Sequence, residues 1–173
     1  DYLGQYFYLP KYEMERIRSQ SNKKLAIMLN EKDVRTEHTE ELLLPCVGLI
    51  EMVRLAIDPK NFERAIELAI VIKKMGFEVG LNVMYMSTWK EQKNFIELLP
   101  KINGIADYFN MVDSFGGVYP EDVREIFALV QSKVDVPIGF HGHNNLELAL
   151  VNSLMAIECG AEIVDATVSG MGR

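Results

Sequence analysis

The 173-residue sequence contains no apolar run that approaches the roughly 20 residues needed to span a membrane. Its start has no initiator methionine and no basic segment followed by an apolar core, so no secretory signal peptide is expected. It also lacks an excess of basic residues, because its formal net charge is −7 and the two signs are mixed along the chain. These absences argue against a membrane or a nucleic acid as a partner.

Cysteine is scarce as well. The two cysteines, Cys46 and Cys159, lie far apart and lack the spacing of a metal or redox motif. We interpret them as buried thiols in a reducing cytoplasm. What is present is ordinary: 49% hydrophobic and 25% charged residues are the composition of one soluble globular domain.

Six apolar segments of strand length alternate with helix-like segments. The predicted strands are Lys24–Asn30, Leu49–Ile57, Phe77–Met86, Tyr108–Asp113, the stretch Pro137–Asn145 and Ile163–Val168. The clearest predicted helices between them are Asn61–Met75, Pro120–Lys133 and Leu146–Cys159. Alternation of this kind indicates a parallel α/β sheet with right-handed crossovers.

The spacing of these segments favours a (β/α)₈ TIM barrel. The strands begin near residues 24, 49, 77, 107, 137 and 163, a repeat of about 30 residues that suits a barrel of eight units. An open doubly wound sheet is the competing fold, but it would be expected to carry a glycine-rich phosphate loop after an early strand, and the sequence has none. Six strands fall short of eight. We therefore expect residues 1–173 to be a partial TIM-barrel catalytic domain, with two N-terminal strands and a C-terminal extension absent.

A pair of histidines, His141 and His143, ends the fifth predicted strand. Side chains alternate faces along a strand, so the two imidazoles point the same way and could share one metal ion. Gly142 between them removes side-chain bulk, and Asn144 or Asn145 could cap the helix that follows. The alternative is that both histidines simply bond loop carbonyls, since an H-x-H pattern alone is weak. Active sites of barrels lie at the carboxyl ends of the strands, which favours the metal site.

Two more polar residues fall inside apolar strands. Arg54 lies between Val53 and Leu55 in an apolar strand and points to the opposite face from them. A buried guanidinium is costly without an anion, which would be either a ligand or a structural partner such as Glu51 or a residue of a neighbouring strand. Asn82 is a second inward-facing candidate, and a satisfied core amide competes with a ligand contact there. The third histidine, His38, is interpreted as a solvated helix residue.

Polar residues also follow two strands. Asp113 and Ser114 precede a flexible loop, where a ligand contact competes with ordinary turn chemistry. In the last predicted strand Asp165 and Thr167 share a face. The turn of residues 170–172, a G-x-G, either offers backbone N–H groups to an anion or merely reverses the chain.

Three segments together resemble one family. They are YFNMVDSFGG (108–117), PIGFHGHNN (137–145) and IVDATVSGMGR (163–173). In this order they resemble the superfamily of metal-dependent pyruvate-type aldolases and lyases that includes hydroxymethylglutaryl-CoA lyase and the isopropylmalate, homocitrate and citramalate synthases. The nearest likeness is to 4-hydroxy-2-oxovalerate aldolase and its relatives.

The resemblance implies a (β/α)₈ barrel in which the six strands are the third to the eighth. It also implies a divalent cation on His141 and His143, with Mn²⁺ or Mg²⁺ favoured over Zn²⁺. The third metal ligand of that family is an aspartate from an R-D pair on the first strand, which would precede Asp1. The enolate-stabilising arginine and the base would lie in the same region, and a further asparagine would follow Arg173.

The implied reaction is cleavage of a 4-hydroxy-2-oxo acid to pyruvate and an aldehyde through a metal-stabilised enolate. Ser114 would hold the carboxylate of pyruvate, with Asp113, Thr167, Asn82 and Arg54 as further substrate-binding candidates. Two alternatives stay open: a Claisen-type condensing transferase that joins an acyl-CoA to a 2-oxo acid, and a non-catalytic barrel that binds a metabolite. The resemblance also implies that the protein forms a homo-oligomer, acts with an aldehyde dehydrogenase and lies in the cytoplasm.

Overall fold

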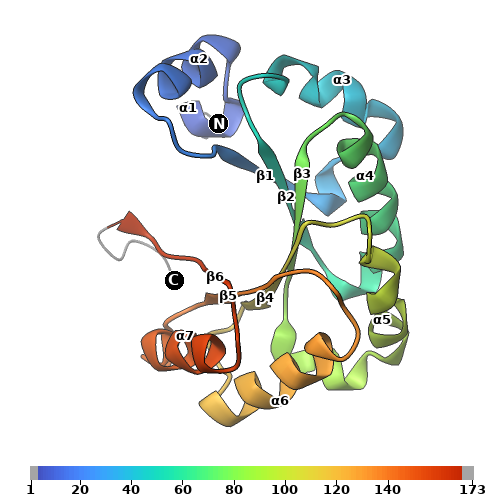
Figure 1. The fold of residues 1–173 in the computed structure, drawn as a ribbon, viewed down its shortest axis with the longest axis vertical. Coiled ribbons are helices and arrows are strands. Elements are labelled where there is room, and N and C mark those ends of the chain that lie inside the picture. Colours follow the sequence, from blue (N-terminus) through green and yellow to red (C-terminus); the bar gives the residue numbers. More distant parts are fainter. Residues whose placement is uncertain (1–3, 169–173) are drawn as a thin grey trace.

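A computed structural model describes residues 4–168 (Figure 1). Six strands form one sheet in the order β1-β2-β3-β4-β5-β6, and each neighbouring pair is parallel. The strands are β1 (Ala26–Asn30), β2 (Met52–Ile57), β3 (Glu78–Val83), β4 (Tyr108–Asp113), β5 (Ile138–Gly142) and β6 (Ile163–Val164). This arrangement confirms the predicted α/β fold, with six strands following one another as they do in the wall of a (β/α)₈ barrel.

Helices cover one side of the sheet. The α-helices are α1 (Gln5–Tyr8), α2 (Lys11–Gln20), α3 (Thr39–Leu43), α4 (Phe62–Lys74), α5 (Lys93–Leu98), α6 (Pro120–Gln131) and α7 (Ala149–Glu158). Short 3₁₀ turns are η1 (Glu31–Asp33), η2 (Thr36–His38), η3 (Leu44–Cys46), η4 (Pro59–Asn61), η5 (Met86–Glu91) and η6 (Leu99–Ile102). Figure 1 shows α3 to α7 following the outside of the curved sheet, while its inner side stays open. None of the helices within residues 4–168 has the length and apolarity to cross a bilayer.

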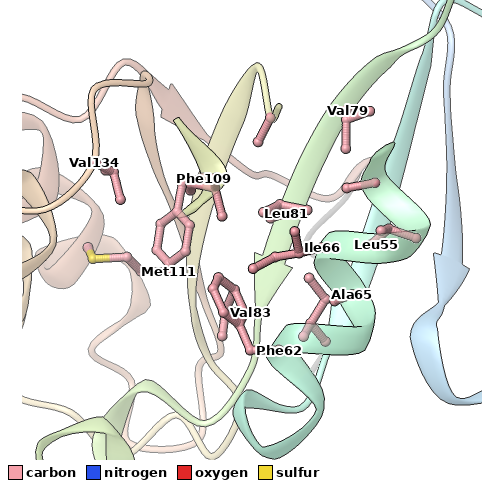
Figure 2. Packing of buried hydrophobic residues seen from close by; sticks show 14 of the residues in the cluster. Leu55, Phe62, Ala65, Ile66, Val79, Leu81, Val83, Phe109, Met111 and Val134 are labelled. Carbon is pink, nitrogen blue, oxygen red and sulfur yellow. The ribbon is translucent and has the colours of Figure 1, made fainter. Parts of the chain in front are cut away.

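The hydrophobic core lies between the outer face of the sheet and these helices. Alternate residues of β2 and β3 point outward and are fully buried: Val53, Leu55 and Ile57, then Val79, Leu81 and Val83. They pack against the apolar stripe of α4, where Phe62, Ala65 and Ile66 lie (Figure 2). Burying each large apolar side chain contributes about 1.5–3 kcal/mol to stability, so this layer holds the sheet in shape.

The inner face of the sheet carries the remaining residues of the same strands. Ala56 aligns with Asn82 of β3, Asn82 with Asn110 of β4, and Asn110 with Gly139 of β5. Because side chains alternate, the next inward positions along the chain after Asn110 and Gly139 are Val112 and His141. The polar residues predicted inside apolar strands therefore gather on the open face, away from the core.

Local signals in the sequence set the ends of several elements as predicted. The Asp58 carboxylate accepts a hydrogen bond from the Lys60 N–H at 3.0 Å where the η4 turn leads into α4. Gly76, with φ of 92°, ends that helical segment in a conformation that disfavours other residues. Pro120 is the first residue of α6, where its missing N–H costs nothing. The helices therefore begin and end within a few residues of the predicted limits.

Two predictions for the C-terminal part were wrong in their limits. The last strand was expected over Ile163–Val168, but β6 ends at Val164, although the Asp165 N–H still donates to the Phe140 carbonyl oxygen of β5 at 3.1 Å. The helix expected from Leu146 begins at Ala149 instead. The N-cap position is Leu148 rather than Asn144 or Asn145, although the Asn144 side chain accepts a hydrogen bond from the Ala149 N–H at 3.1 Å across the longer turn.

Candidate metal centre and substrate cavity

The two predicted histidines meet at the carboxyl end of β5. His141 lies in the strand and His143 one residue beyond it, and their Nε2 atoms are 3.2 Å apart. Both side chains are partly buried and line the same cavity. Gly142 between them faces the other side of the strand, where a Cβ would lie 2.8 Å from the Phe140 ring, so a larger residue there would require a shift. The pair therefore points its outer nitrogens toward a single point.

The hydrogen bonds behind the rings fix their tautomers. The Nδ1 of His143 lies 2.9 Å from the Ser114 carbonyl oxygen, which can only accept, so this Nδ1 carries a proton. The Nδ1 of His141 lies 2.7 Å from Oδ2 of Asp165 and donates in the same way. In the neutral rings both Nε2 atoms are therefore lone-pair acceptors that face each other. Two acceptors at this distance repel unless a cation lies between them.

This donor set fits two ligands of one metal ion. Imidazole nitrogens bind a divalent ion at about 2.1 Å, so two of them at right-angle to tetrahedral geometry are separated by about 3.0–3.4 Å. The observed Nε2 separation of 3.2 Å falls within that range. Among residues 4–168 no third histidine, cysteine, aspartate or glutamate completes a metal-binding group. The described residues thus supply a two-histidine half-site.

Asp165 links the histidines to the interior of the sheet. Its carboxylate accepts from Nη1 and Nη2 of Arg54 at 2.9 and 2.6 Å, in addition to the bond from His141. The two side chains of the ion pair are 19% and 17% exposed. Arg54 therefore forms a structural ion pair, which is one of the two alternatives left open by the sequence. Its partner is Asp165 rather than Glu51, which pairs with Arg18. The suggested Glu51 pair was wrong.

The charge on Asp165 is maintained despite its burial. Burial by itself raises the pKa of this carboxyl, but the hydrogen bonds from His141 and Arg54 and the positive charge of the guanidinium outweigh it and lower the pKa to about 2. An ionised Asp165 holds the proton of His141 on Nδ1. Asp165 is thus placed as a carboxylate that would orient His141 if its Nε2 held a metal ion.

Asn82 has its amide orientation fixed by the same network. Its Oδ1 accepts from the Arg54 Nε at 2.9 Å and from the Asn110 Nδ2 at 3.4 Å. An arginine can only donate, so the oxygen must face Arg54 and the amide nitrogen must point away from it. That Nδ2 has no hydrogen-bond partner within residues 4–168, and Asn82 lines the histidine cavity. Asn82 therefore offers a donor to the cavity rather than serving only as a satisfied core amide.

Ser114 approaches the cavity from the end of β4. Its Oγ accepts a hydrogen bond from the Tyr85 N–H at 2.9 Å. In the described part of the chain the hydroxyl hydrogen finds no acceptor, so it remains able to donate to a ligand. Ser114, Asn82, His141 and His143 line one cavity of about 440 Å³, which brings four predicted site residues together.

The other predicted site residues lie elsewhere. Asp113 is 1% exposed, and its carboxylate accepts from the backbone N–H groups of Gly117 and Val118 at 3.2 and 3.4 Å, which is the turn role that competed with ligand binding. Thr167 is exposed and lines an adjoining cavity with Asp165 and both histidines. The G-x-G turn of residues 170–172 lies outside the described residues.

The sequence placed Asp165 beside Thr167 but did not identify it as a site residue. Its contribution depends on Arg54, 111 positions earlier in the chain. The one available signal was a lone arginine inside an apolar strand, which requires an anion without saying which one.

Comparison with known proteins shows a family and several relatives that this chain resembles in sequence. The HMGL-like family model matches residues 45–173. A 4-hydroxy-2-oxovalerate aldolase from Moorella thermoacetica is 33% identical over 143 residues, covering 76% of this chain and 42% of the relative. One from Geobacillus genomosp. 3 is 34% identical over 154 residues, covering 82% and 45%. The chain thus spans less than half the length of these curated relatives.

Solved structures show the same fold. The N-terminal domain of a putative aldolase from Bacteroides vulgatus is 52% identical, with a TM-score of 0.97, and the match covers 100% of this chain and 58% of that one. The carboxyl transferase domain of Rhizobium etli pyruvate carboxylase, solved with pyruvate and biocytin, has a TM-score of 0.77 at 19% identity, covering 91% and 29%. The second likeness is one of fold alone.

Proposed function

The chain belongs to the HMGL-like family, and from this premise we propose that it forms part of a divalent-metal-dependent aldolase. The reaction is cleavage of a 4-hydroxy-2-oxo acid to pyruvate and an aldehyde. The relatives named 4-hydroxy-2-oxovalerate aldolase support this reaction class. The observation that carries the proposal is the convergence of two Nε2 lone pairs at 3.2 Å, each with its Nδ1 proton fixed from behind.

The chemistry explains the types of residue at the site. Breaking the C3–C4 bond leaves its electron pair on the pyruvate half as an enolate, while the C4 hydroxyl loses its proton to a base and becomes the aldehyde. The enolate then takes up a proton to give pyruvate. A divalent cation held by His141 and His143 supplies a Lewis acid for the 2-oxo group. We place neither the base nor the third ligand within residues 4–168.

The described side chains have distinct roles in this scheme. Asp165 keeps the His141 proton on Nδ1 and so keeps its Nε2 available as a ligand. The Asn82 Nδ2 and the Ser114 hydroxyl are donors toward an anionic 2-oxo acid, where a preorganised donor favours developing negative charge. Thr167 borders the neighbouring cavity and is a further contact for the substrate. Arg54 acts through Asp165 and Asn82, so we assign it to positioning rather than to direct substrate binding.

The first test is the stoichiometry of Mn²⁺ binding to the intact protein. The wild type should bind one Mn²⁺ ion per protein chain, and the double variant His141→Ala/His143→Ala should bind none. His38→Ala is the matched control, because His38 is exposed and belongs to the short η2 turn away from the site. Absence of bound Mn²⁺ in the wild type would refute the metal-dependent mechanism and favour a metabolite-binding barrel.

The second test identifies the reaction. Pyruvate release from 4-hydroxy-2-oxopentanoate, followed with lactate dehydrogenase, should require Mn²⁺ and both histidines. Incubation with acetyl-CoA and a 2-oxo acid should release no free thiol. Thiol release without pyruvate release would replace the aldolase by the condensing transferase.

A further inference from the structure

We propose that Tyr85 and Phe115 select a substrate with a large apolar group on the carbon that becomes the aldehyde. This inference rests on the proposed aldolase function and adds the class of substrate to it. The two rings lie 5.3 Å apart between centroids at an angle of 31°. They come from the loops that follow β3 and β4, at the same end of the sheet as the histidines.

The position of the pair sets it apart from the other aromatic contacts near the sheet. The rings of Phe62, Phe95 and Trp89 pack together within the core and are at most 2% exposed. Phe115, in contrast, is 57% exposed, so its ring contributes little to the folded core. A large apolar side chain held at the mouth of a polar site is better explained by contact with a ligand.

Hydrogen bonds and close packing hold the backbone of the two loops that carry these rings. Tyr85 adopts the left-handed conformation, with φ of 60° and ψ of 37°, which is uncommon for a bulky residue. Its N–H donates to the Ser114 Oγ, and its carbonyl oxygen accepts from both the N–H and the hydroxyl of Thr88 at 2.8 and 2.9 Å. Strain of this kind persists where the surroundings fix it, and such positions concentrate at binding sites.

Two sets of contacts hold the loop that carries Phe115. The buried Asp113 carboxylate accepts from the N–H groups of Gly117 and Val118. Gly116, with φ of 59°, packs so closely on the loop after β5 that a Cβ there would lie 2.6 Å from the Asn145 side chain. The ring is thus presented without a large loss of conformational entropy when a ligand binds.

The rings separate two spaces. On one side lies the histidine cavity with Ser114 and Asn82. On the other is an outer cavity of about 600 Å³, where the two rings are the apolar part of a lining that is otherwise polar or charged (Asp58, Lys60, Thr88, Glu91 and Gln92). The 2-oxo acid end of a substrate occupies the polar side, where the histidines and donors lie. The substituent on C4 then extends toward the rings, which offer an apolar surface suited to an aryl or long alkyl group.

Unreactive analogues test this assignment without requiring catalysis. The intact Mn²⁺-loaded protein is titrated calorimetrically with 2-oxobutanoate, 2-oxohexanoate and 2-oxo-4-phenylbutanoate, which lack the 4-hydroxyl and undergo no retro-aldol cleavage. Affinity should rise along the series, and the phenyl compound should bind about tenfold tighter than 2-oxobutanoate or better. In Phe115→Ala the ratio should fall toward one, and Phe115→Leu should retain part of it. Phe7→Ala is the control, because Phe7 is 67% exposed but lies in α1.

The outcomes separate this inference from the proposed reaction. Equal affinities in the wild type, no binding of any analogue, or a ratio that survives Phe115→Ala would overturn the assignment of the rings, even if pyruvate release from 4-hydroxy-2-oxo acids is observed. A size preference that depends on Phe115, together with no pyruvate release from 4-hydroxy-2-oxo acids that carry either a methyl or a phenyl group on C4, would support the apolar subsite and refute the aldolase function. Thermal melts of each variant confirm that the fold is retained.

Discussion

Arg54 and Asp165 form a two-pronged ion pair across 111 positions of sequence, with Nη1 to Oδ1 at 2.9 Å and Nη2 to Oδ2 at 2.6 Å. The pair joins the middle of β2, the second strand of the sheet, to the residue that follows β6, the strand at the far edge. Through Asp165 it reaches His141, and through its Nε it reaches Asn82. One guanidinium thus fixes both a metal-ligand candidate and a cavity donor.

Removing the guanidinium should destabilise the protein. Arg54→Met leaves the Asp165 carboxylate largely buried without its cation, and breaking a buried pair in this way costs about 3–5 kcal/mol. Because the pair retains some exposure, we expect a loss near the lower end of that range in urea unfolding of the intact protein. Arg54→Lys should recover only part, since an ammonium cannot reproduce the fork. A double-mutant cycle with Asp165→Ala that gives additive effects would show that the pair contributes nothing.

Asp165→Asn should weaken metal binding while the fold is retained. The amide can still accept a hydrogen bond from His141, but it lacks the charge that holds the proton on Nδ1, and such carboxylate partners are worth about 10–100-fold in metal affinity. Electron paramagnetic resonance of free Mn²⁺ measures the dissociation constant directly. Asp135→Asn, at an exposed position of the same residue type, should leave it unchanged. Equal affinities in the two variants would remove Asp165 from the positioning role.

Gly139 is expected to tolerate no side chain. A Cβ there would lie 2.0 Å from Asn110 Oδ1 and 3.0 Å from the Ile163 Cβ. Asn110 cannot turn aside freely, because its Nδ2 donates to the Asn82 Oδ1 that Arg54 also holds. Overpacking of this kind typically costs 1–3 kcal/mol, so Gly139→Ala should lower the free energy of unfolding by about 2 kcal/mol or more.

A control and a rescue variant test this prediction for Gly139. Gly117→Ala adds the same methyl group where the nearest atom is 4.0 Å away, so its cost should be small. Adding Asn110→Ala to Gly139→Ala removes the clashing oxygen and should restore part of the stability. A double variant no more stable than Gly139→Ala would locate the strain elsewhere, against Ile163.

Ser114 and Thr167 are expected to contribute to binding of pyruvate in the intact protein. Ser114→Ala removes a hydroxyl donor beside the histidines and an acceptor for the Tyr85 N–H, so affinity should fall by about tenfold, the usual worth of a hydrogen bond to a charged group. Thr167→Ala should have a smaller effect, because Thr167 is exposed and lines only the adjoining cavity. Calorimetry with pyruvate at saturating Mn²⁺ gives both constants. Unchanged binding would exclude the replaced residue from the site.

Cys46 should resist alkylation in the native state. It is 7% exposed, and burial raises the pKa of its thiol, so little of the reactive thiolate forms near pH 8. In the reaction with a thiol reagent, one thiol should therefore react slowly in the native protein and rapidly in urea. Cys46→Ala should abolish this slowly reacting thiol. Rapid modification of Cys46 without denaturant would contradict the burial of this residue at the end of η3.

Periodic burial made most of the fold predictable. β4 was predicted with the limits it has, and the helix after β2 was bounded by Asp58-Pro59 and Gly76, as observed. Predictions were poorest where long-range contacts compete with the local pattern. The stretch after Val164 has the pattern of a continuing strand, yet β6 ends there, and the pairing of the Asp165 side chain with Arg54 has no local signal.

The sequence by itself determined the alternation of strands and helices, the pair of histidines on one face and the presence of an arginine that needs an anion. These features follow from short-range rules, since side-chain direction repeats every two residues in a strand and every 3.6 in a helix. Only the tertiary structure decided that the anion is Asp165, that Asn82 presents its nitrogen to the cavity and that the two Nε2 atoms meet at 3.2 Å. Those relationships depend on the register and curvature of six strands, which bring Arg54 into contact with Asp165, 111 positions away, and with Asn82.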